Sequence, residues 1–253
     1  MSLSYSKIQV ATQCPRKYYW KYVKKLRPVD DPIDKNTGSL LHRVLAKSWT
    51  GTSLDDALQT ELDSYYQELL PRYGAEAVEQ RDKLARRAAG YLAHYKRLGY
   101  VPPADLVAEK HHTVALPNGE QFVFVPDGYS LTDRTILEIK TGSNPEPDRF
   151  LLYSIQHYTY AYGLQLLGYA GPWSVVYLLL GARKAEVLPA RPMLPAAIEY
   201  AGKWLNEWKP PESNYPNYGT QCQWCEYNLL DETELMGLPV EDVFGHYVAE
   251  ENI

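Results

Sequence analysis

The apolar run from Trp173 to Leu180 is the feature that most constrains how this chain can fold. Gly171-Pro172 precede the run and Gly181 follows it, so turn residues bound it on both sides. A strand that is apolar at every position must be covered on both of its faces, which is typical of a central strand between two layers of helices. The run therefore predicts a layered α/β fold.

Hydrophobic periodicity places helices before and after a small sheet. Helices are expected over residues 4–23 (as two short helices), 38–49, 54–73, 75–99, 148–167 and 194–209, with a polar loop over 30–38. Further strands are expected over residues 106–116, 121–126, 135–140 and 183–188. The fold class is α/β, a mixed central sheet flanked by helices, with an N-terminal helical insertion and a C-terminal cysteine-containing segment. We expect a single domain over 1–253, with a mainly helical region over 1–100, an α/β core over 101–209 and a C-terminal segment over 210–253.

Composition excludes several classes of protein. The 253 residues are 45% apolar and 23% charged, which is close to the globular average and unlike a disordered or collagen-like chain. No stretch approaches the roughly 20 uncharged apolar residues that a bilayer span needs. Lys7, Arg16 and Lys17 interrupt any apolar signal core. We therefore expect a cytoplasmic protein with no membrane partner, and three cysteines are too few for a disulfide scaffold.

Charge is distributed unevenly along the chain, whose net charge is −5. Residues 1–29 carry seven basic residues and no acid, whereas residues 231–253 carry seven acids and no lysine or arginine. The basic segment also contains the aromatic tract from Tyr18 to Tyr22. Such a tract could follow a nucleic-acid strand and stack its bases. The alternative is an ordinary helix whose aromatic side chains pack inward and whose lysines are solvated.

An acid and a base share one face of the strand expected near residue 140. Successive side chains of a strand alternate between faces, so Glu138 and Lys140 point to the same side. Asp127 follows Pro126 at the end of the preceding apolar strand, so its carboxylate can converge with that of Glu138. Two carboxylates suit Mg²⁺ or Mn²⁺, and Lys140 could hold a water molecule or steady the charge of a phosphate. A plain Glu–Lys pair on an edge strand would give the same local pattern.

The joint pattern resembles the PD-(D/E)XK nuclease superfamily. Pro126-Asp127 followed by Glu138-x-Lys140 matches the motif of that superfamily literally. The resemblance implies a restriction-endonuclease-like fold and a hydrolase that cleaves phosphodiester bonds.

Two further motifs resemble those of the RecB-like branch. Gly38-x-x-x-His42 is similar to the motif that precedes the catalytic hairpin there, and Gln156-x-x-x-Tyr160 to the motif on the following helix. The four motifs occur in the family's order over about residues 38–160.

The resemblance implies a role for each of these residues. The implied metal ligands are His42, Asp127, Glu138 and the carbonyl of Ile139. Lys140 would orient the attacking water, while Gln156 and Tyr160, one helical turn apart, would line the active site and the path of the DNA. Glu109, on the strand before the hairpin, could face the site as well.

The cysteines resemble a second set of family positions. Cys14-Pro15-x-x-Tyr18 is similar to the opening of the iron–sulfur RecB-like exonucleases, which include the CRISPR-associated "Cas-four" proteins and the AddB nuclease domain. There, one early cysteine and three late ones, spaced C-x2-C-x5-C, hold a [4Fe–4S] cluster. Cys222 and Cys225 supply two late positions, and Asp231 departs from the pattern at the third. The resemblance implies a cluster held by three cysteines with or without Asp231; a zinc site or a lost cluster with simply packed thiols are the alternatives.

The resemblance also implies a function. It indicates an Mg²⁺- or Mn²⁺-dependent exonuclease that acts on DNA, at free and single-stranded ends, in recombination, repair or CRISPR spacer processing. A non-catalytic nucleic-acid-binding module on the same fold is one alternative, and a restriction-type endonuclease is another.

Overall fold

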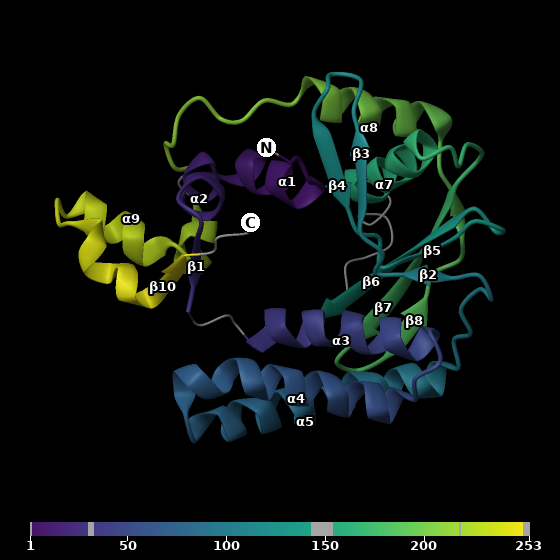
Figure 1. Ribbon diagram of the computed structural model, residues 1–253, viewed down its shortest axis with the longest axis horizontal. Helices are drawn as coiled ribbons and strands as arrows, with labels where there is room; N and C mark the ends of the chain where they lie inside the picture. Colours follow the sequence, from purple (N-terminus) through teal and green to yellow (C-terminus); the bar gives the residue numbers. More distant parts are fainter. Residues whose placement is uncertain (1, 30–32, 143–153, 218, 250–253) are drawn as a thin grey trace. The chain divides into compact units, whose positions relative to one another are not determined.

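The computed structural model describes residues 2–29, 33–142, 154–217 and 219–249 (Figure 1). The chain divides into two compact units. The smaller unit combines Met1–Asp31 with Glu207–Ile253, and the larger unit comprises Pro32–Asn206. The larger unit contains every residue predicted for the divalent-metal site, and the smaller unit contains the three cysteines.

Within the described residues, a mixed sheet of six strands forms the centre of the larger unit. Its strands are β2 (Val107–Ala108), β5 (Gly128–Ser130), β6 (Thr135–Gly142), β7 (Ser174–Gly181), β8 (Ala185–Val187) and β9 (Arg191–Pro192). The order is β2-β5-β6-β7-β8, with β9 also paired to β7. β6 and β7 run parallel, and the other pairs are antiparallel. The register of the parallel pair places Glu138 beside Tyr177.

β7 is the buried strand that the apolar run predicts. Leu178 and Leu180 belong to the main hydrophobic core with helices of one layer. Tyr177 points to the other face, where its hydroxyl lies 2.8 Å from Nδ1 of His157. Because both faces are covered, apolar side chains are stable at almost every position of the strand. The layered α/β fold is therefore confirmed.

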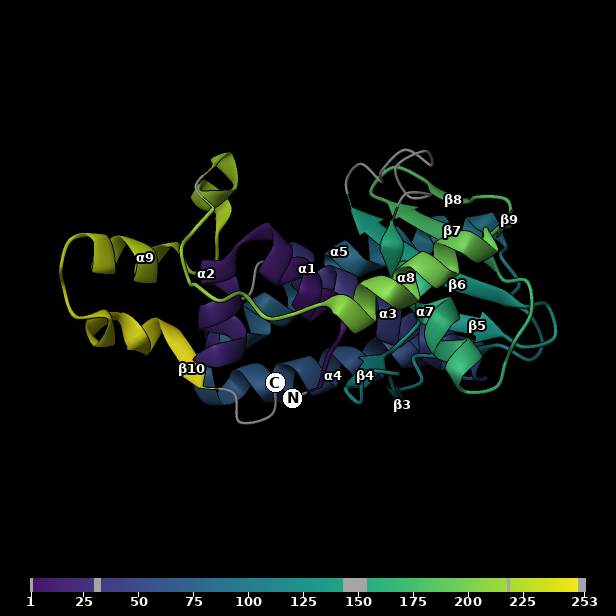
Figure 2. The same ribbon diagram turned by 90° about the horizontal axis from the view of Figure 1, so that it is seen from above.

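Helices cover both faces of this sheet. One layer consists of α3 (Ile33–Trp49), α4 (Leu54–Tyr73) and α5 (Glu76–Leu98). The other side carries α7 (Ile155–Leu166), α8 (Pro195–Glu207) and the hairpin of β3 (His112–Ala115) and β4 (Gln121–Phe124) (Figure 1). Figure 2 looks down onto α7 and α8, with α3 to α5 on the far side of the sheet. The layer of α3 buries Leu41, Val44 and Leu45, the apolar stripe of its sequence, against the sheet and its neighbouring helices.

Several expected boundaries are wrong. α3 begins at Ile33, inside the expected loop; Thr37 is buried there, and its hydroxyl donates to the Ile33 carbonyl at 2.6 Å. The strand expected over 106–116 is divided into β2 and β3, which belong to different sheets. Glu109 lies at the break with a φ of 48°, which no extended strand tolerates. The helix expected over 148–167 begins, in the described residues, at Ile155; residues 148–153 lie outside them.

The smaller unit brings the two ends of the chain together. Its elements are α1 (Tyr5–Gln13), α2 (Pro15–Tyr18), the π-helical turn η1 (Tyr19–Val23), β1 (Leu26–Pro28), the 3₁₀ turn η2 (Thr220–Trp224), α9 (Asn228–Leu235), the 3₁₀ turn η3 (Val240–His246) and β10 (Tyr247–Ala249). β1 pairs antiparallel with β10, the purple and yellow strands of Figure 1. Trp20, Tyr227 and Leu230 form the centre of its small core. Among the described residues of both units, no helix has the length and apolar character that a membrane span requires.

Candidate active site

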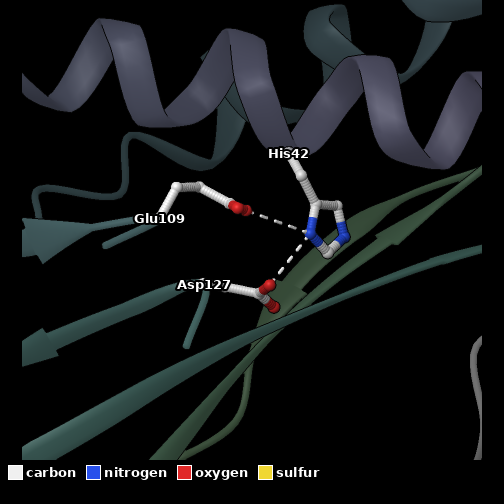
Figure 3. A group of neighbouring side chains, drawn as sticks. All are labelled: His42, Glu109 and Asp127. Atoms are coloured by element: carbon white, nitrogen blue, oxygen red, sulfur yellow. Dashed lines mark hydrogen bonds and ion pairs between the residues drawn. The ribbon is translucent and has the colours of Figure 1, made fainter. Parts of the chain in front are cut away.

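His42, Glu109 and Asp127 converge from three different segments of the larger unit (Figure 3). Nδ1 of His42, on α3, lies 2.9 Å from Oδ1 of Asp127 and 3.6 Å from Oε1 of Glu109. One potential ligand atom of each residue lies within 4.8 Å of the other two. One imidazole and two carboxylates form a donor set that Mg²⁺ or Mn²⁺ accepts. The cluster is therefore a candidate metal centre.

A close helix–strand contact places His42 in this cluster. A Cβ atom at Gly38 would lie 2.9 Å from Oγ1 of Thr141 in β6, so a larger residue would force the Thr141 side chain or α3 itself to shift. His42 follows one helical turn later on the same side of α3. The spacing Gly38-x-x-x-His42 thus has a packing reason, because the glycine lets the histidine reach the carboxylates.

Backbone hydrogen bonds fix the carboxylate of Asp127 and the backbone of Glu109. Oδ2 of Asp127 accepts a hydrogen bond from the N–H of Ile139 at 2.6 Å. The carbonyl of Asp127 accepts one from the N–H of Glu109 at 3.2 Å. Glu109 itself adopts a left-handed backbone, which is uncommon for a residue other than glycine and clusters at functional sites. The kink at Glu109 therefore belongs to the construction of the site.

The electrostatic environment of His42 is set by its two acidic neighbours. Burial alone would lower the pKa of the imidazole, but the carboxylates of Asp127 and Glu109 outweigh that effect and raise its pKa from 6.5 to about 10. A metal-binding imidazole must be neutral. A proton and a cation therefore compete for His42.

Glu138 and Lys140 extend from β6 on one face, as the alternation of strand side chains predicts. Nζ of Lys140 lies 3.2 Å from Oε2 of Glu138. Glu138 is 1% exposed, and its Oε1 has no hydrogen-bond partner within the part of the chain that the structure describes. Burial, and then the charge of Asp127, raise the pKa of Glu138 to about 7, against the opposing effect of Lys140. A cation would satisfy this buried oxygen, so the residues present fit a divalent metal.

Gln156 and Tyr160 of α7 support Lys140 from the side. Oε1 of Gln156 accepts from Nζ of Lys140 at 3.1 Å, and Nε2 of Gln156 donates to the hydroxyl of Tyr160 at 2.8 Å. The ring of Tyr160 is buried and stacks on Phe124 with 6.0 Å between ring centroids. Tyr160 is therefore placed to hold Gln156, and Gln156 to hold the ammonium group of Lys140.

A cavity of about 640 Å³ opens over the cluster. This volume is in the range of ligand-binding pockets, roughly 300–1,000 Å³. Its acidic lining is formed by Glu109 and Asp127 of the candidate metal centre. The remaining lining includes Lys35, Ser39 and Arg43 of α3. We did not predict these three residues from the sequence, although their spacing of four residues marks one face of a helix.

The cysteines lie in the smaller unit as free, half-buried thiols. Burial is the main cause that raises the pKa of Cys225, and Asp231 and Cys14 lie near enough to raise it further. Within the described residues, no three of Cys14, Cys222, Cys225 and Asp231 bring their ligand atoms within 4.8 Å of one another.

Asp231 has partners of its own. Its Oδ1 accepts hydrogen bonds from Nε of Arg16 at 3.0 Å and from Nε1 of Trp20 at 2.9 Å. This oxygen of Asp231 is therefore already engaged.

The mixed sheet, its two helical layers and the acidic cluster define a nuclease-type core. A family model for the PD-(D/E)XK nuclease superfamily matches residues 2–229, and the chain belongs to that superfamily. Membership indicates a metal-dependent nuclease with a nucleic-acid substrate, as the motifs predict. A solved structure described as "Crystal structure of SSO0001" is 14% identical over 90% of this chain and 84% of its own, with a TM-score of 0.39. No curated protein matches the chain significantly.

Proposed function

We propose that the protein is an Mg²⁺- or Mn²⁺-dependent deoxyribonuclease that uses the cavity over His42, Glu109 and Asp127. One observation carries the proposal: an imidazole and two carboxylates from three segments meet at one point, beside a buried carboxylate with an unpartnered oxygen. Half-buried carboxylates beside the buried Glu138 are costly unless a cation balances them. The family match spans residues of both units, which supports their inclusion in one nuclease domain.

The residues would divide the work as follows. The cation would be held by His42, Glu109, Asp127, Glu138 and the carbonyl of Ile139. A bound divalent cation supplies a Lewis acid that stabilises charge on a phosphate and makes water more acidic. Lys140, held between Glu138 and Gln156, would bind the attacking water or the charged phosphate oxygen with its ammonium group.

The finer assignment is an exonuclease of the RecB-like type that acts on single-stranded DNA ends in recombination, repair or CRISPR spacer processing. Two contacts support the RecB-like part: Gly38 packs on β6 beside the cluster, and Gln156 contacts Lys140. A restriction-type endonuclease would instead cut closed-circular DNA at discrete sites. Dependence on free ends, tested with circular and linear forms of one strand, supports the exonuclease.

The cysteines support a [4Fe–4S] cluster in the smaller unit as a second component of the proposal. Cys14, Cys222 and Cys225 supply soft thiolate ligands. Asp231 would become a ligand only by giving up its contacts with Arg16 and Trp20 or by using its second oxygen. Anaerobically purified protein should be brown and contain iron and sulfide. Colourless protein with one equivalent of zinc, or without metal, would reject the cluster and leave the nuclease proposal intact.

A cleavage assay tests the nuclease proposal. A fluorescent single-stranded oligonucleotide with Mn²⁺ should be degraded by the wild type and not by Lys140→Ala. Lys184→Ala is the matched control, because Lys184 is an exposed lysine that pairs with Glu186 away from the cavity. Equal DNA binding without degradation by any of the three proteins would favour the non-catalytic binding module.

A further inference from the structure

The face of α3 that carries His42 also carries a row of side chains suited to an anion. Lys35, Ser39 and Arg43 follow one another at intervals of four residues, which places neighbours on successive turns. All three line the cavity that contains Glu109 and Asp127. The cavity lining therefore combines acidic residues suited to a cation with basic and hydroxyl-bearing residues suited to an anion.

Glu61 of α4 holds Arg43 in position. Its Oε2 accepts from Nε of Arg43 at 2.5 Å, and its Oε1 lies 2.8 Å from Nζ of Lys47. The side chain of Glu61 is only 8% exposed. Although burial raises the pKa of Glu61, Lys47 and Arg43 lower it below its ordinary value, so the carboxylate stays charged. One acid thus faces two cations, and this group keeps a net positive charge.

The contact with Glu61 leaves the phosphate-binding part of Arg43 available. It uses Nε, and across the described ranges neither terminal amino group of Arg43 has a hydrogen bond. These amino groups form the planar fork with which arginine binds phosphate oxygens. Because Glu61 already fixes the side chain, binding at the fork costs less conformational entropy.

We propose that Arg43, with Ser39 and Lys35 beside it, forms a phosphate-binding subsite next to the candidate metal centre. The inference rests on the proposed nuclease function and names what else the site binds. Its ligand is the backbone phosphate next to the one that is cleaved. The acidic cluster acts on the cleaved phosphate through a cation, and Arg43 binds the neighbouring phosphate directly.

The test uses single-stranded oligonucleotides in which one phosphate at a time is an uncharged methylphosphonate. For the unmodified strand, Arg43→Ala should raise KM about tenfold or more with kcat within about twofold, because a charge-assisted contact made before the reaction is lost. The salt dependence of log affinity should decrease by roughly 0.7. A methylphosphonate beside the cleaved position should raise KM for the wild type and have no further effect on Arg43→Ala. Arg43→Lys keeps the charge without the fork and should recover only part of the affinity.

Lys47→Ala is the matched control, since Lys47 pairs with the same Glu61 but does not line the cavity. Its KM should equal that of the wild type, and thermal denaturation should show all variants folded.

Equal increases in KM for Lys47→Ala and Arg43→Ala would reject the subsite. A difference confined to strands with a terminal phosphate, against strands with a terminal hydroxyl, would reject the assignment to a backbone phosphate. Cleavage by the wild type with unchanged KM in Arg43→Ala rejects the subsite alone, whereas no cleavage by the wild type rejects the nuclease function and the subsite together.

Discussion

Asp127 in the larger unit and Asp231 in the smaller unit are both aspartates that sequence motifs predict as ligands, but the structure surrounds them differently. Asp127 contacts the imidazole of His42 and lies near two further acids, Glu109 and Glu138. Asp231 contacts the guanidinium of Arg16 and the indole of Trp20. A cation fits where acids accumulate, whereas a carboxylate that already faces a fixed positive charge has less to gain from one. Partners, rather than motif position, therefore distinguish a poised ligand from a structural acid.

Asparagine substitutions at Asp127 and at Asp231 should give the largest difference between the two sites. Asp127→Asn should lower the Mn²⁺-dependent cleavage rate by about 10²–10³-fold, the usual cost of removing one electrostatic contact to the reacting group. Asp231→Asn should leave the rate, measured on the folded protein, within about threefold. Initial rates on the fluorescent strand at saturating Mn²⁺ check both values. Comparable activity losses in the two variants would show that Asp231 is as important for the metal centre as Asp127.

The free energy of unfolding, unlike the cleavage rate, should depend on Asp231. Asp231→Ala leaves the buried Arg16, whose side chain is 7% exposed, with Glu234 as its other acidic partner. Loss of a buried ion-pair partner costs about 3 kcal/mol at the lower end of the usual range, and Glu234 keeps the cost there. The free energy of unfolding from urea denaturation measures this loss. An unchanged free energy would mean that the Arg16–Asp231 contact does not hold the ends of the chain together.

Substitutions of two helical glycines test how His42 is positioned in the candidate metal centre. Gly38→Ala should weaken Mn²⁺ binding about tenfold, because the added Cβ shifts the contact between Thr141 and α3, the helix that carries His42. Gly90→Ala in α5 is the matched control, since a Cβ there meets nothing within 4 Å. It should leave Mn²⁺ binding unchanged and stabilise the helix by up to about 1 kcal/mol. Isothermal titration calorimetry would detect the difference, and equal Mn²⁺ affinities would exclude the positioning role of Gly38.

Lowering the pH should destabilise the larger unit, because the buried His157 resists protonation in the folded state. Burial, together with the charge of Lys140, lowers the pKa of His157 from 6.5 to about 4. The unfolded chain binds the proton first, so the contribution to stability is complete above pH 6.5 and is lost as the pH falls toward 4. The expected loss between pH 6.5 and pH 5 is about 1.5 kcal/mol. Urea denaturation across this range should show a shallower pH dependence for His157→Gln, and an unchanged slope would contradict the assignment.

Local sequence patterns predict the fold and the centre of the site well, because the periodicity of apolar residues indicates the elements and the spacing of motif residues indicates a shared face. The continuous apolar run specifies a strand covered on two faces, and alternation places Glu138 and Lys140 on one side of β6. The spacing of Gly38 and His42 gives one helix face. Family membership then confirms the α/β class and the nuclease prediction at the level of the superfamily.

Features that depend on distant partners do not follow from local patterns. The left-handed backbone of Glu109, which places its carboxylate beside His42, occurs at a residue type that seldom adopts it. The contact of Arg16 with Asp231 joins residues 215 positions apart. Arg43 looks like any solvated helix residue until the structure shows Glu61 beneath it and the cavity beside it. In each case a long-range partner decides what the side chain does.

The position of a bound cation tests the central claim most directly. Crystals of the protein grown or soaked with Mn²⁺ should give an anomalous scattering peak within bonding distance of His42, Glu109 and Asp127, and Asp127→Asn should remove the peak together with the cleavage activity. An active protein whose Mn²⁺ lies elsewhere, while His42 keeps its contacts with Glu109 and Asp127, would contradict the account.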